Sequence, residues 1–242
     1  MNRRELLVRG LMAGTAIVMP TGLLARELSQ TGMLRAPGAA DPPYFGTETE
    51  GFLTAAERRA LDAITARLIP GDADSPGARE AGVVTFIDRQ LAGFYGRAQH
   101  WYMQGPFPEA LETQGYQYDR TPAQLIRTGL EALGAHTRTT YQGADFADLT
   151  PEQQDEILHA LEEGEILFPG MSSKGFFEFV HEMTIEGFFC DPVYGGNQGM
   201  VGWQLVGFPG ARYDYRDFIH HNGARIDLPP VGLMGRPGWS AG

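Results

Sequence analysis

The sequence contains a single cysteine, Cys190. One cysteine rules out a disulfide within the chain, and no Cys-x-x-Cys pair is present to ligate an iron–sulfur cluster or to attach a c-type haem. The chain therefore cannot carry either of these groups by itself. In an exported protein, an unpaired cysteine either remains a free thiol or bonds to another chain.

Motifs for nucleotide binding and for nucleophilic catalysis are also missing. No Gly-x-Gly-x-x-Gly follows a strand pattern, and neither Gly-x-x-x-x-Gly-Lys-Ser/Thr nor Gly-x-Ser-x-Gly occurs. The glycines at 195, 196, 199 and 202 do not have the spacing of a phosphate-binding loop. These absences favour a binding or structural role, and we expect no cofactor, metal or catalytic residue in this chain.

The body of the protein has little positive charge. The 242 residues include 19 Lys and Arg against 30 Asp and Glu, a formal net charge of −11. The first 40 residues hold five of the basic residues and two of the acidic ones, so the remainder is still more acidic. An acidic surface argues against binding to nucleic acid or to anionic membranes, and it leaves room for a more basic protein partner.

The apolar run near the N-terminus is too short for a comfortable membrane span, which needs about 20 residues. It covers residues 11–24 and follows the adjacent pair Arg3 and Arg4. A basic start and a short apolar run are typical of an export signal, and paired arginines indicate the twin-arginine (Tat) route. The alternative is an uncleaved membrane anchor. We expect residues 1–40 to be a Tat export signal and linker, and residues 41–242 to be a single helical domain.

No stretch of the sequence alternates convincingly between apolar and polar residues, so strands are not expected. Instead, capping boxes mark three helix starts, at residues 54–57 (TAAE), 121–124 (TPAQ) and 150–153 (TPEQ). Apolar residues recur at helical spacing behind each box, and also over residues 78–92 and 173–189. The sequence predicts an all-α fold, a small helical bundle.

Two connections are long for a compact domain. Residues 93–120 are rich in aromatic residues and glycine, and residues 190–242 have almost no helical pattern apart from a short turn near 213–220. Long irregular segments of this kind are normally functional or packed against something. We therefore expect long irregular loops rich in glycine and aromatic residues, and an extended C-terminal segment.

Two Glu-x-x-His pairs provide the best metal hypothesis. Glu156 and His159, and likewise Glu178 and His181, share a helix face at i,i+3 spacing, and two such motifs build di-iron sites in four-helix bundles. Such a site also needs a bridging glutamate from each of two further helices, and the interval between the two motifs is too short for an intervening helix. A stand-alone metal-dependent enzyme is thus the alternative hypothesis. The simpler interpretation is that the four side chains of these pairs are exposed to solvent and bind no metal.

One stretch, from Phe188 to Arg212, fits neither helical nor strand periodicity: FFCDPVYGGNQGMVGWQLVGFPGAR. Its Asp-Pro, Tyr-Gly-Gly-Asn, Gly-Trp and Gly-Phe-Pro-Gly elements, with the preceding SSKGFFEFVHEMTIEGFF, resemble the gluconate 2-dehydrogenase subunit 3 family. The upstream segments FLTAAERRALDAITARLIPGD and PGAREAGVVTFIDRQLAG are similar to the first two helices of that family. The resemblance spans roughly residues 52–215, and the twin-arginine leader fits the family too.

The resemblance implies a non-catalytic small, or gamma, subunit of a membrane-associated flavoprotein dehydrogenase. Its partners would be a large FAD-containing subunit of the glucose–methanol–choline type, which oxidises a sugar acid or polyol, and a multihaem cytochrome c. FAD and haem c would belong to those partners. The small subunit would assist export and assembly of the large one, in the periplasm and at the inner membrane through its complex. A transient export chaperone is a further alternative.

Aromatic residues in a loop shaped by glycine and proline give a large, rigid contact area, which suits the centre of a protein interface. The alternative is that these aromatics only fold back over the bundle. The residues that we expect at a partner interface are Phe188, Phe189, Cys190, Asp191, Pro192, Tyr194, Gly195, Gly196, Asn197, Trp203, Phe208 and Pro209.

Two fates are open for Cys190. If the glycine-rich run is an interface, the thiol lies at its edge, and an oxidising compartment permits a disulfide to the large subunit. The alternative is a buried free thiol, because free cysteine is among the most buried residue types.

Overall fold

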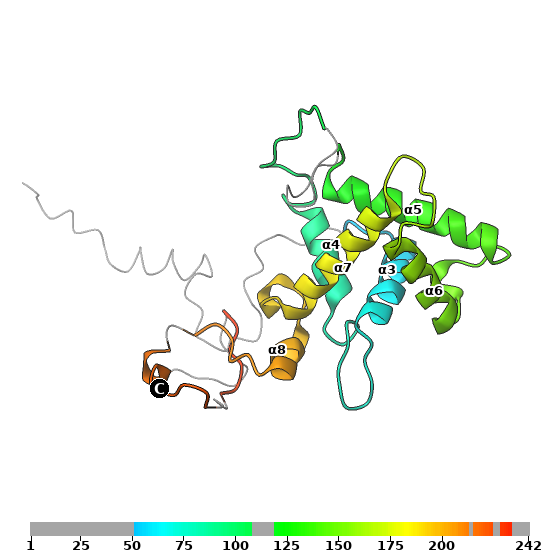
Figure 1. Cartoon of the computed structure of the whole chain (residues 1–242). Coiled ribbons are helices and arrows are strands. Elements are labelled where there is room, and N and C mark those ends of the chain that lie inside the picture. Colours follow the sequence, from blue (N-terminus) through cyan, green and yellow to red (C-terminus); the bar gives the residue numbers. More distant parts are fainter. Residues whose placement is uncertain (1–50, 108–118, 213–214, 225–227, 234–242) are drawn as a thin grey trace, which may run out of the picture. The chain divides into compact units, whose positions relative to one another are not determined.

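The computed structural model describes residues 51–107, 119–212, 215–224 and 228–233. Across these residues the secondary structure is helical and contains no β-strand, apart from one isolated bridge between Gly210 and Val231. The predicted all-α fold is therefore confirmed (Figure 1). Within the same residues, no helix combines the length and the apolar character needed to cross a membrane. The Tat signal with Arg3 and Arg4 lies outside the described residues and stays a prediction.

Three helices begin at threonine caps, as the sequence predicted. They are α3 (Ala55–Leu68), α5 (Pro122–Thr140) and α6 (Pro151–Glu162). In each, the hydroxyl of the threonine accepts a hydrogen bond from the backbone amide three residues later, and the Glu or Gln side chain at that position accepts from the amide of the threonine. Each capping box thus satisfies two of the amides that a helix start leaves without intrahelical partners.

Helix α4 (Val83–Ala92) is shorter than the segment 78–92 that the sequence predicted, so the prediction was wrong for its first turn. Residues 78–82 form turns instead, and the helix begins after Gly82, which has a left-handed backbone with φ 69°. A left-handed residue interrupts a right-handed helix, and glycine adopts that conformation without steric cost. Helix α7 (Ser173–Phe189) has the predicted bounds, and the Ser172 side chain accepts a hydrogen bond from the amide of Gly175.

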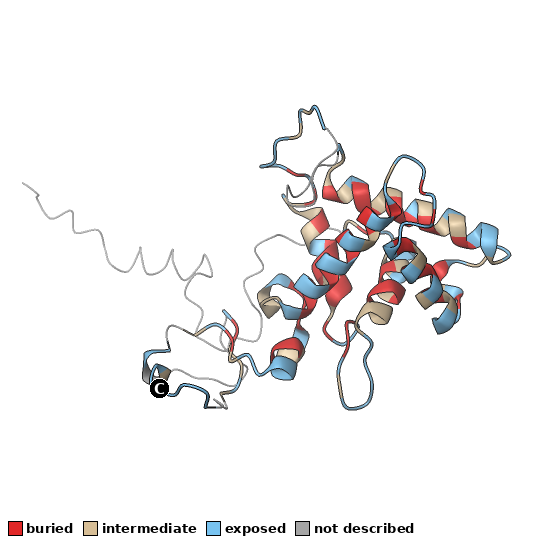
Figure 2. Cartoon of the chain, viewed as in Figure 1, coloured by how far each residue is buried: buried red, intermediate tan, exposed pale blue. Residues whose placement is uncertain are grey.

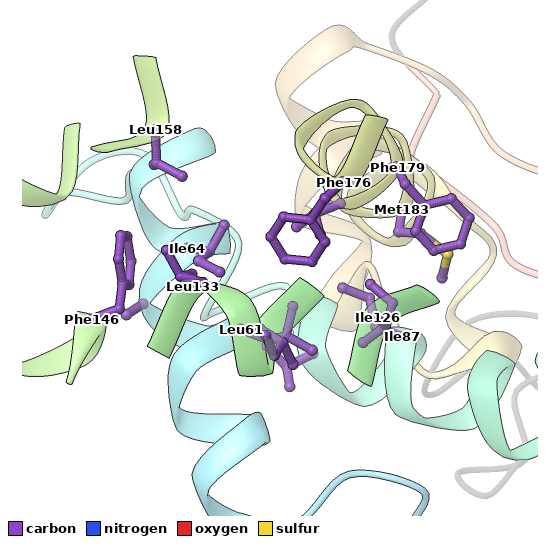
Figure 3. Close-up of a cluster of buried hydrophobic side chains, with 14 of the residues drawn as sticks. Leu61, Ile64, Ile87, Ile126, Leu133, Phe146, Leu158, Phe176, Phe179 and Met183 are labelled. Atoms are coloured by element: carbon purple, nitrogen blue, oxygen red, sulfur yellow. The ribbon is translucent and has the colours of Figure 1, made fainter. Parts of the chain in front are cut away.

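Helix α7 lies at the centre of the bundle and packs against α3, α4, α5 and α6. Figure 3 shows the core between these helices as a cluster of fully or largely buried side chains. The labelled members are Leu61, Ile64, Ile87, Ile126, Leu133, Phe146, Leu158, Phe176, Phe179 and Met183. Burial in Figure 2 follows the same arrangement, with the buried side of each helix turned toward its neighbours.

Helices α5 and α7 pack tightly together where Gly129 meets Phe176. A β-carbon at position 129 would lie 2.0 Å from the phenyl ring of Phe176, so a larger residue there would displace the ring. Phe176 is only 1% exposed. Burying a side chain of this size contributes about 2–3 kcal/mol to the stability of the fold.

Beyond α7, the chain contains short helical pieces that the sequence did not predict. They are the 3₁₀ turns η3 (Pro192–Tyr194) and η4 (Gln198–Met200) and the short helix α8 (Val201–Val206). Six residues are too few to show helical periodicity, which is why α8 was missed. The short turn expected near residues 213–220 contains the 3₁₀ turn η5 (Arg216–Phe218).

Candidate functional site

The stretch from Phe188 to Arg212, hereafter the glycine-rich segment, folds back over the C-terminal end of α7. Helix α8 contacts α7, and the backbone between them turns through left-handed residues at Gly195, Asn197, Gly199 and Met200. The last carbonyls of any helix lack intrahelical donors and must find partners elsewhere. Here the glycine-rich segment supplies several of those donors.

Asn197 is the central donor. Its side chain is fully buried, and its Nδ2 donates to the carbonyl of Cys190 at 2.8 Å. Its backbone amide donates to the carbonyl of Gly187 at 2.9 Å, while its Oδ1 accepts from the amide of Gly202 at 2.8 Å. One asparagine thereby joins the end of α7 to the start of α8. Its backbone has φ 45°, and asparagine is one of the few residues besides glycine that adopts this conformation routinely.

Trp203 caps a further carbonyl of α7. Its indole Nε1 donates to the carbonyl of Phe189 at 2.7 Å, and the ring is only 6% exposed. The outer side of the indole packs edge-to-face against Phe208, with 5.2 Å between ring centroids. Trp203 therefore fixes the position of α8 against α7 and of Phe208 against α8.

Two glycines allow this close packing. A β-carbon at Gly196 would lie 2.1 Å from the carbonyl oxygen of Gly187, and one at Gly202 would lie 2.2 Å from the carbonyl oxygen of Phe188. Both distances are far below van der Waals contact, so any larger residue would push the segment off the helix end. These glycines are thus needed because the segment packs directly against the backbone of α7, and they do not form a phosphate-binding loop.

Asp191 ties residues 228–233 to the same site. Its Oδ2 accepts a hydrogen bond from the amide of Leu233 at 2.6 Å. Nearby, the amide of Ala211 donates to the carbonyl of Val231 at 2.6 Å. The glycine-rich segment is therefore held on one side by α7 and on the other by part of the C-terminal region.

The twelve residues predicted at an interface differ widely in exposure. Whether any of them contacts a partner stays a prediction, but the buried ones shape the segment from within and do not offer surface. The buried members are Phe188, Gly195, Gly196, Asn197 and Trp203; the half-buried ones are Cys190, Asp191, Pro192 and Pro209; and the exposed ones are Phe189, Tyr194 and Phe208.

Two exposed apolar residues of this site were missed by the sequence reasoning. Leu205 and Val206, on α8, are each 60% exposed. They stand beside Phe208, which is 45% exposed. The segment around them shows no helical periodicity, so the sequence does not indicate which side of α8 faces solvent. The exposure of this Leu-Val pair could therefore not be predicted.

Cys190 caps the end of α7 as a half-buried free thiol. Its Sγ lies 3.5 Å from the carbonyl oxygen of Gly187. Burial raises the pKa of the thiol to about 11, and the charges of Asp191 and Glu186 act in the same direction. The thiol is therefore protonated at neutral pH. A disulfide to a partner subunit stays a prediction.

The two Glu-x-x-His pairs do not form a site. The side chain of His159 is 81% exposed and lies 3.4 Å from Glu162, while Glu178 is 62% exposed and lies 4.0 Å from Lys174. Among the described residues, no group of three or more His, Cys, Asp or Glu side chains is placed to hold a metal ion. The two Glu-x-x-His pairs of the di-iron hypothesis lie on different helices, α6 and α7, and their side chains do not meet.

Two hollows lie elsewhere on the described surface. One, of about 240 Å³, is lined by α3, α5 and the 3₁₀ turn η2 (Phe146–Asp148); the other, of about 400 Å³, lies between α3 and the start of α4. Each hollow is bordered by an ion pair, Arg138 with Asp145 at 2.9 Å and Arg79 with Asp62 at 2.8 Å. None of the residues predicted at a site lines either hollow.

A comparison with protein families gives a match to this chain. The family model described as gluconate 2-dehydrogenase subunit 3 matches residues 55–210, from the first residue of α3 to the bridge at Gly210. The match includes the helical bundle and nearly all of the glycine-rich segment. Searches of curated proteins and of solved structures returned no significant match.

Proposed function

Because the chain belongs to the gluconate 2-dehydrogenase subunit 3 family, we propose that it is the small, non-catalytic subunit of a dehydrogenase complex of that kind. The complex oxidises a sugar acid or a polyol in the periplasm. The observation that carries the proposal is the family match over residues 55–210, which covers the bundle and the site at its end.

In this proposal the redox chemistry belongs to the partners. A large FAD-dependent subunit of the glucose–methanol–choline type oxidises the substrate, and a multihaem cytochrome c takes the electrons through haem c. The small subunit carries no cofactor and assists export and assembly of the flavoprotein through the Tat translocase. The complex is peripheral to the inner membrane.

The use of polar groups in the glycine-rich segment supports a non-catalytic role. The side chains of Asn197, Trp203 and Asp191 form hydrogen bonds with backbone groups of the same chain. A catalytic group must instead present a nucleophile, acid or base to substrate. The segment also presents apolar side chains to solvent, namely Phe208 and the Leu205-Val206 pair of α8, and exposed apolar groups of this kind favour contact with another protein.

Purification of the intact assembly tests the proposal. A tag on the C-terminus of this chain, expressed in its native host, should retain flavin and haem c at a fixed ratio, together with dehydrogenase activity toward an artificial electron acceptor. The same chain produced alone should be colourless and inactive. Stoichiometric flavin or iron in the chain alone would contradict the proposal. If the flavoprotein binds this chain before export but is absent from the chain purified after export, the transient export chaperone would be favoured.

A further inference from the structure

Helix α7 carries a row of three large apolar residues and one histidine, hereafter the apolar row, that is partly exposed to solvent. Phe177, His181, Ile185 and Phe189 follow one another at i,i+4 spacing, which places them along one stripe of the helix. His181 stacks on Phe177 with 5.9 Å between ring centroids and nearly parallel planes. Ile185 is 42% exposed and Phe189 is 37% exposed, although both are large apolar residues in a helix whose opposite side forms the core.

An acidic row runs beside it. Glu178, Glu182 and Glu186 each lie one residue beyond a member of the apolar row, and all three are exposed. In the described part of the chain, the ion pairs of this row are limited to Glu178 with Lys174, at 4.0 Å. Like charges at i,i+4 repel one another, and the partial burial of the Glu186 carboxyl together with the charge of Glu182 raises its pKa. This repulsion is not relieved within the described chain.

Helix α8, which packs against α7, also carries exposed apolar residues. Trp203 connects the two helices, because its indole nitrogen bonds to the carbonyl of Phe189 and its ring packs against Phe208. Leu205, Val206 and Phe208 then add exposed apolar surface at the same end of α7. Figure 2 shows exposed residues along α7 and at the free end of α8. Grouped exposed apolar side chains of this kind mark interaction sites.

We propose that this surface, the α7–α8 face, binds the FAD-containing subunit. The contacting patch on that subunit would place lysines or arginines opposite the acidic row and an apolar hollow opposite the apolar row. The α7–α8 face comprises Glu178, Glu182, Ile185, Glu186, Phe189, Leu205, Val206 and Phe208.

Charge argues against two other occupants of this face. A second copy of the chain would bring another acidic row toward the first, and an anionic membrane surface would be repelled in the same way. A basic patch instead neutralises both unpaired glutamates and removes apolar side chains from water in the same step. The inference rests on the proposed function and adds to it the surface and the chemistry of its partner.

Charge reversal tests the acidic row. In the tagged complex, Glu182→Lys with Glu186→Lys should lower the flavin retained per chain by tenfold or more. The matched control, Glu131→Lys with Glu163→Lys, changes the charge equally at exposed positions of α5 and at the end of α6 and should stay within twofold of wild type. Thermal unfolding of the full chain should be unchanged or shifted upward by the α7 reversal, because a lysine at position 182 lies four residues after Glu178, and one at position 186 lies in the last turn of the helix, where positive charge is favourable.

Photo-crosslinking tests the apolar row. A photoreactive phenylalanine analogue at Ile185 or at Leu205 should crosslink to the FAD-containing subunit, at peptides that contain Lys or Arg beside apolar residues. The control position is Leu167, which is 91% exposed and outside the face. Crosslinks from the face to a second copy or to the cytochrome would overturn the inference, as would a reversal variant that keeps its flavin. In both cases the proposed function would stand if wild type retains flavin. A wild-type chain without flavin would overturn both.

Discussion

At the scale of single residues, the end of α7 depends on Asn197, a polar side chain without exposure to solvent. Burying an amide is costly unless each of its groups finds a partner. Here Nδ2 and Oδ1 both do so, on the carbonyl of Cys190 and the amide of Gly202, and the backbone of Asn197 is left-handed. The Tyr-Gly-Gly-Asn element of the sequence is therefore a helix-to-helix connector.

We predict that Asn197→Ala lowers the free energy of unfolding by about 2–4 kcal/mol, because it leaves a buried carbonyl and a buried amide without partners and forces alanine into φ 45°. Urea unfolding followed by circular dichroism measures the change. Asn197→Gly separates the two causes, since it restores the backbone but not the hydrogen bonds, and should recover about 1 kcal/mol. Asn222→Ala, at an exposed position, is the control. A loss no larger than that of the control would show that the side-chain bonds do not hold the segment.

The second residue-scale prediction concerns the reactivity of Cys190. With the pKa of the thiol raised to about 11 by burial, the thiolate that reacts with alkylating agents is scarce at pH 8. Alkylation of the native chain should therefore be roughly two orders of magnitude slower than that of an ordinary thiol with a pKa of about 8.5. The reference is Thr140→Cys in a Cys190→Ser background, since residue 140 is exposed.

Two results would decide between the fates of Cys190. Slow alkylation that becomes fast in denaturant, with free migration of this chain on a non-reducing gel of the complex, indicates a buried thiol. A band at the summed mass of two subunits that disappears with reductant, and in Cys190→Ser, indicates an intersubunit disulfide instead.

At the scale of secondary-structure elements, the capping boxes explain why the helix starts could be read from the sequence. Each box is local, because the Thr and the Glu or Gln lie three residues apart and need no distant partner. The boxes at Thr54, Thr121 and Thr150 therefore formed where the sequence placed them. The core stripes behind them are equally local in origin, since 3.6-residue periodicity alone sets which side of a helix is buried.

We predict that Thr121→Ala and Thr150→Ala each lower the free energy of unfolding by about 1 kcal/mol, because each leaves first-turn amides without an acceptor. Thr→Ser at the same positions keeps the hydroxyl and should cost only a fraction of that. Thermal and urea unfolding of the four variants provide the measurement. Equal costs for Ala and Ser would mean that packing of the threonine methyl, and not the cap, stabilises these starts.

The elements that the sequence did not reveal depend on contacts between distant parts of the chain. Helix α8 exists because Trp203 and Asn197 bond to carbonyls at the end of α7, and no local pattern reports such bonds. The start of α4 was misplaced for a related reason, since Gly82, the left-handed residue before the helix, packs against the side chain of Gln198 far along the chain. The position of the candidate site could be predicted from its unusual composition, but the exposure of Leu205 and Val206 could not.

At the scale of the whole molecule, several arginines are engaged in ion pairs within the chain. Arg67 binds Asp155 through two hydrogen bonds, and Arg127 reaches both Glu57 and the carbonyl of Phe52. Further intramolecular ion pairs join Arg58 to Asp88 and Arg59 to Asp148. With 30 acidic and 19 basic residues in the chain, such pairing leaves an excess of unpaired carboxylates for solvent or for a basic partner.

The last prediction concerns export of the whole molecule and depends on Arg3 and Arg4. Replacing both with lysine keeps the positive charge but removes the planar guanidinium groups, and a receptor that reads the arginine pair should no longer accept the leader. The precursor should then accumulate in the cytoplasm, and the flavoprotein should be stranded with it if it has no signal of its own.

Cell fractionation with immunoblotting measures both proteins, and periplasmic dehydrogenase activity reports the assembled complex. Arg9→Lys is the control, because it changes an arginine of the same leader outside the pair and should leave export intact. Normal periplasmic activity in the Arg3→Lys, Arg4→Lys variant would contradict the Tat assignment. Loss of this chain from the periplasm while the flavoprotein still arrives and is active there would show that the large subunit travels on its own, so that the small subunit is not required for its export.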